Sequence, residues 1–349
     1  MKKKKVLFLY TELAAYTIAC FQKLSELGLE IHVIRYPVNK EAPFNFDKHN
    51  SIHFYERSAL DISGISELIK RIEPSLIVCS GWIDKDYISV CKKHYEKITT
   101  VVAFDNKWKG SWRQLLASVG GKFTISKYFH FAWVPGEVQA KYAAKLGFNK
   151  DKIVKGFYSC DQTYFNSYFE KFKNEKAVHF PHRFIFVGRY YDFKGVTELW
   201  KAFVELKLEF DNDWELWCLG KGDIDPVQHL SIKHFGFVQP NEIEKFMKET
   251  GVFVLPSRTE PWGVALHEFS AAGFPLLCSD EVGAAETFLN EKENGFTFCT
   301  NDKNDLKAKL KQFISMSDVE LNRMGSKSNE LSKKITTTTW ADSALEMIK

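Results

Sequence analysis

The chain has 349 residues, of which 45% are hydrophobic and 26% charged, and its formal net charge is +4. This length exceeds the usual size of one hydrophobic core, so we expect a globular protein of two domains. The mild charge neither requires nor excludes an anionic partner, and we expect no binding to nucleic acid.

The seven cysteines are scattered and form no CxxC or His/Cys cluster. This spacing argues against a metal site and favours reduced thiols in the cytosol. Only a short apolar run, residues 6–10, follows the first lysines, so we expect no signal peptide. No stretch approaches the roughly 20 apolar residues of a transmembrane helix. We therefore expect a cytoplasmic protein, with peripheral contact at the inner face of a membrane as an open alternative.

Strands and helices are predicted to alternate through the first half. The pattern predicts a strand at 6–10, a helix over 13–27 that ends at Gly28, and a strand at 30–35. Further short apolar strands are predicted at 76–80, 100–104, 132–135 and 153–156. Such alternation is typical of a parallel, doubly wound α/β sheet, here an N-terminal domain over residues 1–166.

The polar run FEKFKNEK leads us to expect an interdomain linker at 167–182 and a C-terminal domain over 183–336. Strands are predicted at 184–187, 214–219, 234–237, 252–255 and 295–298, and helices at 196–209, 242–250, 264–272 and 302–315. A last helix is predicted within 337–349.

Residues 253–280 form a strand, a loop, a helix and a second strand, which is one βαβ unit. Glu260 follows the first strand, and Glu268 lies about one turn into the helix. The free N–H groups of the first helical turn suit a phosphate. A carboxylate on each side of an anion site fits a ligand with an anionic middle and hydroxylated ends, such as a nucleotide sugar.

Glycines and charged residues follow the strands of the second half in a fixed order. The series is Gly188-Arg189, Lys194-Gly195, Gly220-Lys221-Gly222, Gly236, Pro256-Ser257, Glu260, Gly263, Glu268, Gly273 and Asn294-Gly295. Over about residues 180–300, this ordered series resembles the C-terminal domain of retaining, nucleotide-sugar-dependent glycosyltransferases of the GT-B type (glycosyltransferase family four, glycosyl transferases group 1). The resemblance implies two Rossmann-like domains that face a cleft, with the last helix completing the N-terminal domain.

The resemblance also implies a role for each matching residue of the donor site. Arg189 and Lys194 would bind the two phosphates and stabilise the leaving nucleoside diphosphate in place of a metal. Glu268 would accept hydrogen bonds from the ribose hydroxyls, and Glu260 would contact the transferred sugar. The catalytic set is then Arg189, Lys194 and Glu260, and the donor-binding set adds Gly188, Val238, Trp262, Gly263, Val264 and Glu268.

Each of these residues also has a simpler interpretation. The two cations would be solvated surface charges, Glu260 would pair with the helix dipole, Glu268 would face solvent, and Val238 would be plain loop or core. Candidates for acceptor contact on the N-terminal domain are Glu12, Asp105, Asn106 and Lys107, for which a local turn network is an equally good explanation. This half departs from the family pattern, because the loop at 10–15 has no glycine and residues 104–108 have no histidine.

Sugar transfer from a nucleotide sugar to a hydroxyl of a glycan or lipid-linked acceptor, with retention and without cofactor or metal, is the function that the resemblance implies. Bacterial surface polysaccharide synthesis is the implied setting. A sugar-nucleotide epimerase and an inactive nucleotide- or glycan-binding module remain alternatives. The segment 107–133 mixes cations with aromatic residues, which fits either ordinary amphipathic packing or contact with an anionic membrane.

Overall fold

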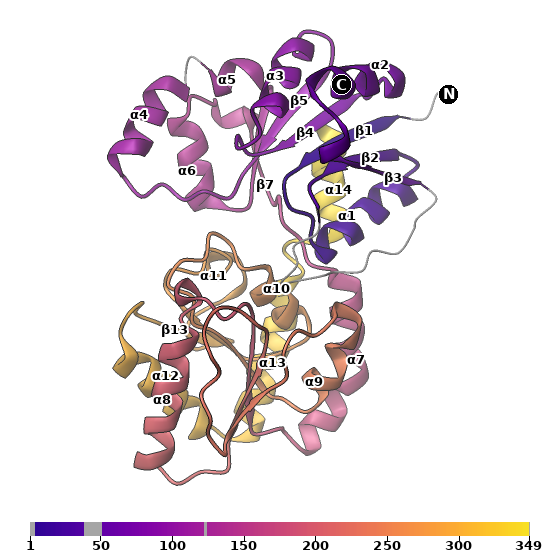
Figure 1. Ribbon diagram of the computed structural model, residues 1–349. Helices are drawn as coiled ribbons and strands as arrows, with labels where there is room; N and C mark the ends of the chain where they lie inside the picture. Colours follow the sequence, from indigo (N-terminus) through magenta and orange to yellow (C-terminus); the bar gives the residue numbers. More distant parts are fainter. Residues whose placement is uncertain (1–3, 38–50, 122–123, 349) are drawn as a thin grey trace. The chain divides into compact units, whose positions relative to one another are not determined.

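The computed structural model describes residues 4–37, 51–121 and 124–348. The chain divides into two compact units, Met1–Ser159 with Ile335–Lys349, and Cys160–Lys334 (Figure 1). Each unit has its own parallel sheet with helices packed on both faces, so the two Rossmann-like α/β domains expected from the sequence are confirmed. None of the helices within the described residues is long and apolar enough to cross a membrane.

The sheet of the N-terminal unit has the strand order β3-β2-β1-β4-β5-β6-β7, and every neighbouring pair is parallel. The strands are β1 (Lys5–Tyr10), β2 (Glu30–Arg35), β3 (Ile52–Glu56), β4 (Leu76–Ser80), β5 (Thr99–Ala103), β6 (Phe131–Val134) and β7 (Ile153–Lys155). The order reverses between β1 and β4, which is the place where ligands bind in open sheets of this kind.

Helices cover both faces of this sheet. They are α1 (Ala15–Glu26), α2 (Ile62–Ile72), α3 (Lys85–His94), α4 (Trp112–Gly121), α5 (Ile125–Tyr128), α6 (Glu137–Lys145) and α14 (Thr337–Glu346). One hydrophobic core lies under α1 and α14, and the other lies under α2, α3 and α6. The last helix therefore completes the first unit: Trp340 of α14 is 2% exposed and packs 4.7 Å from Trp133 of β6, measured between ring centroids.

The sheet of the C-terminal unit has the order β10-β9-β8-β11-β12-β13, again with parallel neighbours throughout. Its strands are β8 (Arg183–Val187), β9 (Glu215–Leu219), β10 (Ile232–His234), β11 (Val252–Leu255), β12 (Leu276–Ser279) and β13 (Gly295–Phe298). The order reverses between β8 and β11. The strand predicted at 234–237 was placed wrongly, because β10 ends at His234 and Phe235–Phe237 run on as loop.

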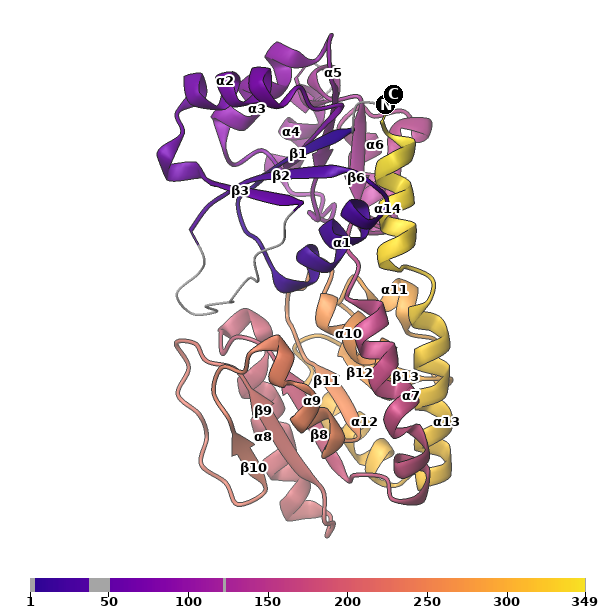
Figure 2. The same ribbon diagram turned by 90° about the vertical axis from the view of Figure 1, so that its right-hand side faces the viewer.

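The helices of the C-terminal unit are α7 (Gln162–Val178), α8 (Val196–Glu209), α9 (Glu244–Lys248), α10 (Val264–Ala271), α11 (Ala285–Phe288), α12 (Lys303–Ile314) and α13 (Asp318–Ser332). Short 3₁₀ turns lie at Asp192–Lys194 and Pro240–Glu242. The long helix α13, which lies beside α7 in Figure 2, was not predicted from the sequence.

The prediction of a linker at 167–182 is wrong. Most of that segment belongs to α7, whose residues lie within the C-terminal unit. Phe165, Tyr168, Phe172 and Lys176 are buried at helical spacing, and the other polar residues of FEKFKNEK are exposed and form the outer face of an amphipathic helix. The first unit ends at Ser159 instead, just before the Asp161 cap of α7.

Candidate functional site

Two loops interlock at the carboxyl edge of the C-terminal sheet, where the strand order reverses. One follows β8 and the other follows β11. The carbonyl oxygen of Phe193 in the first loop accepts hydrogen bonds from the backbone N–H groups of Arg258 (2.8 Å) and Thr259 (3.3 Å) in the second. Gly195 has φ +66°, and a Cβ there would lie 2.0 Å from the Pro256 carbonyl oxygen. Only glycine permits this contact, so the Lys194-Gly195 step belongs to the architecture of the site.

The two loops bring Lys194 and Glu260 together. Lys194 Nζ lies 2.5 Å from Glu260 Oε2, and the two side chains are only 16% and 12% exposed. The same carboxylate oxygen accepts a hydrogen bond from Ser257 Oγ at 3.0 Å. Both charged residues were predicted from the sequence as site residues, but their ion pair was not. The hydrogen bond from Ser257 to Glu260 was also missed, although Ser257 lies only three residues before Glu260.

Arg189 directly follows β8 and Gly188. Its guanidinium lies 5.5 Å from the centroid of the Tyr191 ring, and no carboxylate of the described ranges pairs with it. The backbone here is tightly packed, because a Cβ on Gly220 would lie 1.8 Å from the Gly188 carbonyl oxygen. Arg189 therefore offers a cation with free hydrogen-bonding capacity at the edge where Lys194 and Glu260 meet.

Helix α10 begins at this edge with Gly263 as its N-cap. Gly263 has φ +95°, and a Cβ there would meet Glu260 Cγ at 3.0 Å and Leu255 Cδ2 at 3.1 Å. No side chain caps this end of α10, so the positive end of the helix dipole points to the region of Glu260. The indole of Trp262 is buried and packs against Phe288, so only the backbone of Trp262, like that of Val264, is suited to contact a ligand.

Glu268 lies further along α10 and is half-buried. Burial raises the pKa of its carboxyl to about 7, and the nearby Asp161 carboxylate adds to this rise. Asp161 caps α7 by accepting a hydrogen bond from the Tyr164 backbone N–H at 3.1 Å, and burial raises its pKa as well. Asp161 is a neighbour of the site that sequence reasoning missed, although an Asp directly before a helix was a visible signal.

Val238 is set apart from these residues. It lies in the loop after β10, and β10 is the edge strand of the sheet, with β9 between it and β8. The structure therefore groups Gly188, Arg189, Lys194, Glu260 and the start of α10 at the reversal point, and it places Val238 at the side of that group.

The predicted acceptor-side residues lie at the carboxyl edge of the other sheet. Glu12 is exposed after β1, while Asp105, Asn106 and Lys107 follow β5, and β4 separates the two strands. Asp105 accepts a hydrogen bond from Tyr158 Oη at 3.3 Å. The backbone N–H of Thr11 donates to Ser80 Oγ at 3.0 Å, so the glycine-free loop after β1 is tied to the end of β4.

Among the described residues, one group could hold a metal ion: Glu30, His32 and His53. It lies at the amino ends of β2 and β3, on the opposite edge from the predicted acceptor-side residues. The two nitrogens of His32 already contact Tyr55 Oη (3.0 Å) and Glu30 Oε1 (2.9 Å). Glu30 Oε1 also lies 3.7 Å from His53 Nε2, and the two imidazole rings are stacked at 24°.

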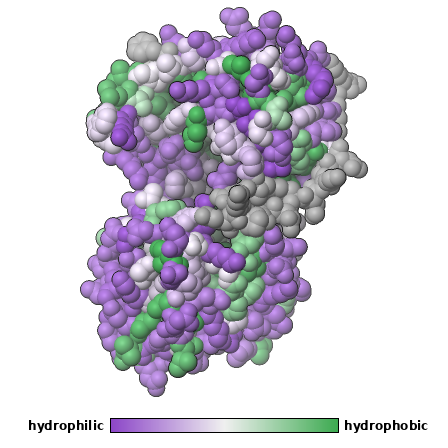
Figure 3. All heavy atoms as spheres, in the orientation of Figure 1, coloured by the Kyte–Doolittle hydropathy of each residue, from purple (hydrophilic) through white to green (hydrophobic). Residues whose placement is uncertain are grey.

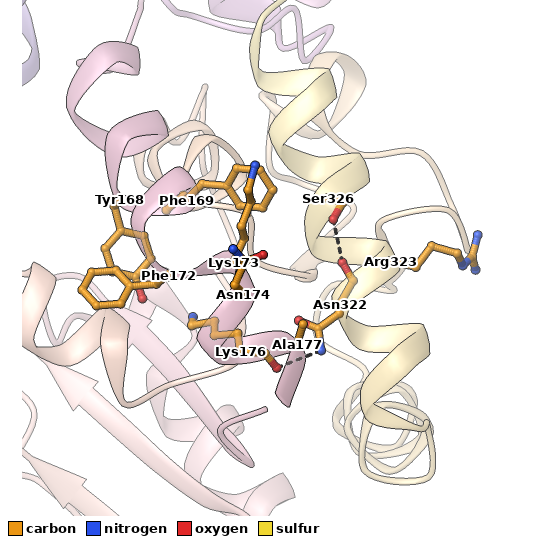
Figure 4. A pocket seen from close by; sticks show the side chains of 12 residues that line it. Tyr168, Phe169, Phe172, Lys173, Asn174, Lys176, Ala177, Asn322, Arg323 and Ser326 are labelled. Carbon is orange, nitrogen blue, oxygen red and sulfur yellow. Dashed lines mark hydrogen bonds between the residues drawn. The ribbon is translucent and has the colours of Figure 1, made fainter. Parts of the chain in front are cut away.

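A cavity of about 280 Å³ lies between α7 and α13, and Figure 4 shows the side chains around it. It is lined by none of the predicted site residues. Lys176 at this cavity donates from Nζ to the Thr250 carbonyl oxygen at 2.9 Å, and Nζ lies 3.8 Å from the centroid of the Phe274 ring. Burial lowers the pKa of Lys176 to about 7. These contacts tie α7 to the start of β11, which explains the buried lysine structurally.

Comparison with known proteins adds a family context to this geometry. Residues 167–331 match the family of glycosyl transferases group 1. The chain is 26% identical over 328 residues to an uncharacterized glycosyltransferase of Methanocaldococcus jannaschii, covering 88% of this chain and 86% of the relative. It is 31% identical over 134 residues to the amylovoran biosynthesis glycosyltransferase of Erwinia amylovora, covering 34% and 33% of the two chains.

The fold has a close counterpart among solved structures. The structure of HepE from Anabaena in complex with UDP and glucose superposes with a TM-score of 0.73 at 12% identity, covering 98% of both chains. At this identity the likeness establishes the fold alone, and the GT-B architecture expected from the sequence is confirmed. The family match and the glycosyltransferase relatives support a glycosyltransferase.

Proposed function

We propose that this chain transfers a glycosyl unit, such as a hexose, from a nucleotide-diphosphate sugar to a hydroxyl of a glycan or lipid-linked acceptor. The observation that carries the proposal is the convergence of Lys194, Glu260 and the uncapped start of α10 at the reversal point of the C-terminal sheet. The family match and the glycosyltransferase relatives support sugar transfer. The relative from amylovoran biosynthesis supports a role in bacterial surface polysaccharide or glycoconjugate synthesis.

The charges at this edge suit a donor with a diphosphate at its centre. Phosphate oxygens would bind at the N-terminus of α10, the positive end of its dipole. The guanidinium of Arg189 and the ammonium of Lys194 would neutralise their negative charge. Leaving-group charge grows as the glycosidic bond breaks, so cations already in place stabilise the transition state more than the ground state. Glu268, in its ionised form, would accept hydrogen bonds from the ribose hydroxyls.

In this proposal Glu260 binds the sugar of the donor. Its two contacts, with Lys194 Nζ and Ser257 Oγ, fall on one oxygen, Oε2. The other oxygen, Oε1, is then the acceptor for a sugar hydroxyl, and Lys194 holds the carboxylate in place for it. The hydroxyl acceptor would be bound by the N-terminal unit, where Glu12 and Asp105 to Lys107 are the candidate contacts.

Two features of the reaction are proposed from the family resemblance. The first is retention at the anomeric carbon, which is read from the proton NMR coupling of the anomeric hydrogen in the first product formed. The second is activity without a metal, because the cations are supplied by Arg189 and Lys194. Full activity in excess chelator is expected, and complete loss restored by a divalent cation would contradict this part.

Two alternatives are separated by simple observations. A sugar-nucleotide epimerase would convert the donor without any acceptor, and a changed nucleotide sugar in a reaction lacking acceptor would identify it. An inactive binding module would bind nucleotide but release no nucleoside diphosphate with any acceptor.

The first experiment is a thermal-shift panel of UDP, GDP, ADP and CMP with their sugars. A ligand that binds only the folded protein raises the melting temperature by mass action. We expect one nucleoside diphosphate to raise it, and Arg189→Ala and Glu268→Ala to abolish the rise. Arg323→Ala is the matched control, since Arg323 is an exposed arginine of the same unit on α13. No shift with any ligand, or equal loss in Arg323→Ala, would contradict the proposed donor site.

A further inference from the structure

Helix α4 of the N-terminal unit presents an apolar stripe to the outside. Trp112, Leu115, Leu116 and Val119 are 67%, 53%, 64% and 63% exposed. Their spacing of three and four residues puts them within an arc of roughly 100° on one face of the helix. In Figure 3, hydrophobic residues reach the surface at the left edge of this unit, the edge along which α4 runs in Figure 1. The four residues are called the α4 stripe below.

The contacts of α4 lie on the side away from the stripe, where Gln114 bonds the loop that leads into the helix and Gly121 lies against Leu146. Gln114, about opposite the stripe, accepts a hydrogen bond from the Lys109 backbone N–H (2.7 Å) and donates one to the Lys107 carbonyl oxygen (2.7 Å). Gly121 alone is buried among the residues of α4. An ordinary surface helix has the reverse arrangement, and a helix of ten residues is marginal without a covered apolar face. Of the two interpretations of 107–133, ordinary amphipathic packing therefore does not describe α4.

The charge of the surrounding segment indicates what covers the stripe. From residue 106 to residue 136 the sequence has no Asp or Glu, and it has Lys107, Lys109, Arg113, Lys122 and Lys127. Arg113 lies directly beside the stripe, with its guanidinium 5.4 Å from the centroid of the Trp112 ring. Tryptophan and leucine on one face with cations around them and no carboxylate is the composition of a helix that lies in an anionic lipid interface.

We propose that α4 docks the N-terminal unit on an anionic lipid bilayer, with the α4 stripe inserted among the acyl chains and with Lys109 and Arg113 at the headgroups. Binding requires no transmembrane span, because the helix lies in the plane of the interface. The proposal stands on the exposed α4 stripe and on the charge of the segment around it, and it does not depend on the proposed sugar transfer.

Flotation of the purified chain with vesicles tests the proposal. The vesicles are phosphatidylcholine alone, or phosphatidylcholine with 30% phosphatidylglycerol. We expect binding to the anionic vesicles, weaker binding to the neutral ones, and a decrease as salt is added. Leu116→Glu should lower partitioning by about tenfold or more, because it puts a charge where a leucine would insert among the acyl chains. Lys109→Glu with Arg113→Glu should remove the preference for anionic lipid.

The matched control is Leu230→Glu, which places the same charge on a leucine of the C-terminal unit that is 99% exposed. It should bind vesicles as the unchanged chain does. Circular dichroism and the melting temperature of each variant verify that it is folded, so loss of vesicle binding with an unchanged melting temperature isolates the membrane step.

Two outcomes would overturn the proposal. One is the absence of binding to anionic vesicles, or binding that Leu116→Glu leaves unchanged. The other is concentration-dependent self-association in light scattering that Leu116→Glu abolishes while no lipid is bound, which would make a second copy of this chain the cover of the stripe.

Discussion

Glu268 and the Lys194–Glu260 pair show how single side chains are tuned at the reversal point of the C-terminal sheet. Glu268 loses water on α10 and has Asp161 as a neighbour, so its ionised form is disfavoured. The Glu260 side chain is only 12% exposed, but it has Lys194 and Ser257 as partners. The two carboxyl groups, eight residues apart, therefore differ in function. Glu268 is suited to bind a diol, and Glu260 is held by a fixed cation, Lys194.

The raised pKa of Glu268 predicts a pH dependence of stability. Its folded-state pKa is about 7 against an ordinary value of 4.5, so between these values the folded state binds more protons than the unfolded state. The contribution of this group to the free energy of unfolding should therefore fall as pH rises from about 4.5 to about 7. Melting temperatures from pH 4 to pH 8 should show a smaller fall in Glu268→Gln. Parallel curves would contradict the assignment.

The same group predicts a pH dependence of donor binding. If ribose hydroxyls donate to the ionised carboxylate, affinity for a nucleotide sugar should weaken as pH falls below about 7. Titration calorimetry of the unchanged chain and of Glu268→Gln at pH 6 and pH 8 measures this. The variant should bind weakly at both values, whereas an equal pH effect in both proteins would assign it to another group.

The Lys194–Glu260 contact predicts a coupling energy. Lys194→Met leaves the mostly buried Glu260 carboxylate with Ser257 as its remaining partner, so it should destabilise the fold by about 2–3 kcal/mol. Adding Glu260→Gln to Lys194→Met should recover part of this loss, with a coupling of about 1–3 kcal/mol. Urea unfolding of the two single variants and the double variant completes the cycle. Additive losses would mean that the two side chains do not interact in solution.

Glycines decide how the elements meet at this site. The start of α8, at Gly195, approaches the carbonyl oxygen of Pro256, the first residue after β11, and the cap of α10, at Gly263, approaches Glu260. Both have positive φ, so both contacts need a residue without Cβ. Each helix thus begins close against the neighbouring loop, which sets where its N–H groups and dipole point.

Gly195→Ala should be among the most damaging small substitutions in the chain. Its Cβ would lie 2.0 Å from a backbone oxygen, and its φ of +66° adds strain, so a loss of about 2–4 kcal/mol is expected. Gly120→Ala on α4 is the control, because nothing lies within 4 Å of its Cβ position, and it should be neutral or stabilise by up to about 1 kcal/mol. Differential scanning calorimetry compares the two. An equal, small change in both would show that the loops after β8 and β11 yield easily.

On the scale of the whole molecule, the last residues of the chain complete the first unit. Trp340 packs against Phe8 of β1 and Trp133 of β6, and its indole Nε1–H donates to the Phe157 carbonyl oxygen at 2.6 Å. The C-terminal unit is inserted between two segments that share one core. The N-terminal unit can therefore reach its full stability only after the whole chain has been made.

Trp340→Ala tests this dependence. Loss of a buried tryptophan and its hydrogen bond should cost about 3–5 kcal/mol, and the loss should be confined to the N-terminal unit. Hydrogen exchange followed by mass spectrometry should show faster exchange in β1 and β4 and unchanged exchange in β8 and β11. Equal acceleration in both sheets would mean that the two units unfold together.

Local patterns in the sequence were sufficient for the alternation of strands and helices, for the glycines at strand ends and for the grouping of Arg189, Lys194 and Glu260 on one sheet. Strand and helix periods are local properties, and the carboxyl ends of parallel strands share an edge whatever the details of packing. A resemblance in the order of those residues was then enough to predict the GT-B fold, which the structure confirms.

Tertiary packing decided what local patterns leave open. FEKFKNEK has the composition of a linker, but the partners of its buried face lie on distant helices, so only the folded chain shows that it is α7. The pairing of Lys194 with Glu260 and the approach of Asp161 to Glu268 join residues 66 and 107 positions apart, where periodicity carries no information. The orientation of α4 was also decided by tertiary packing. The sequence shows that the helix is amphipathic, but only the folded chain shows that its apolar side is the exposed one.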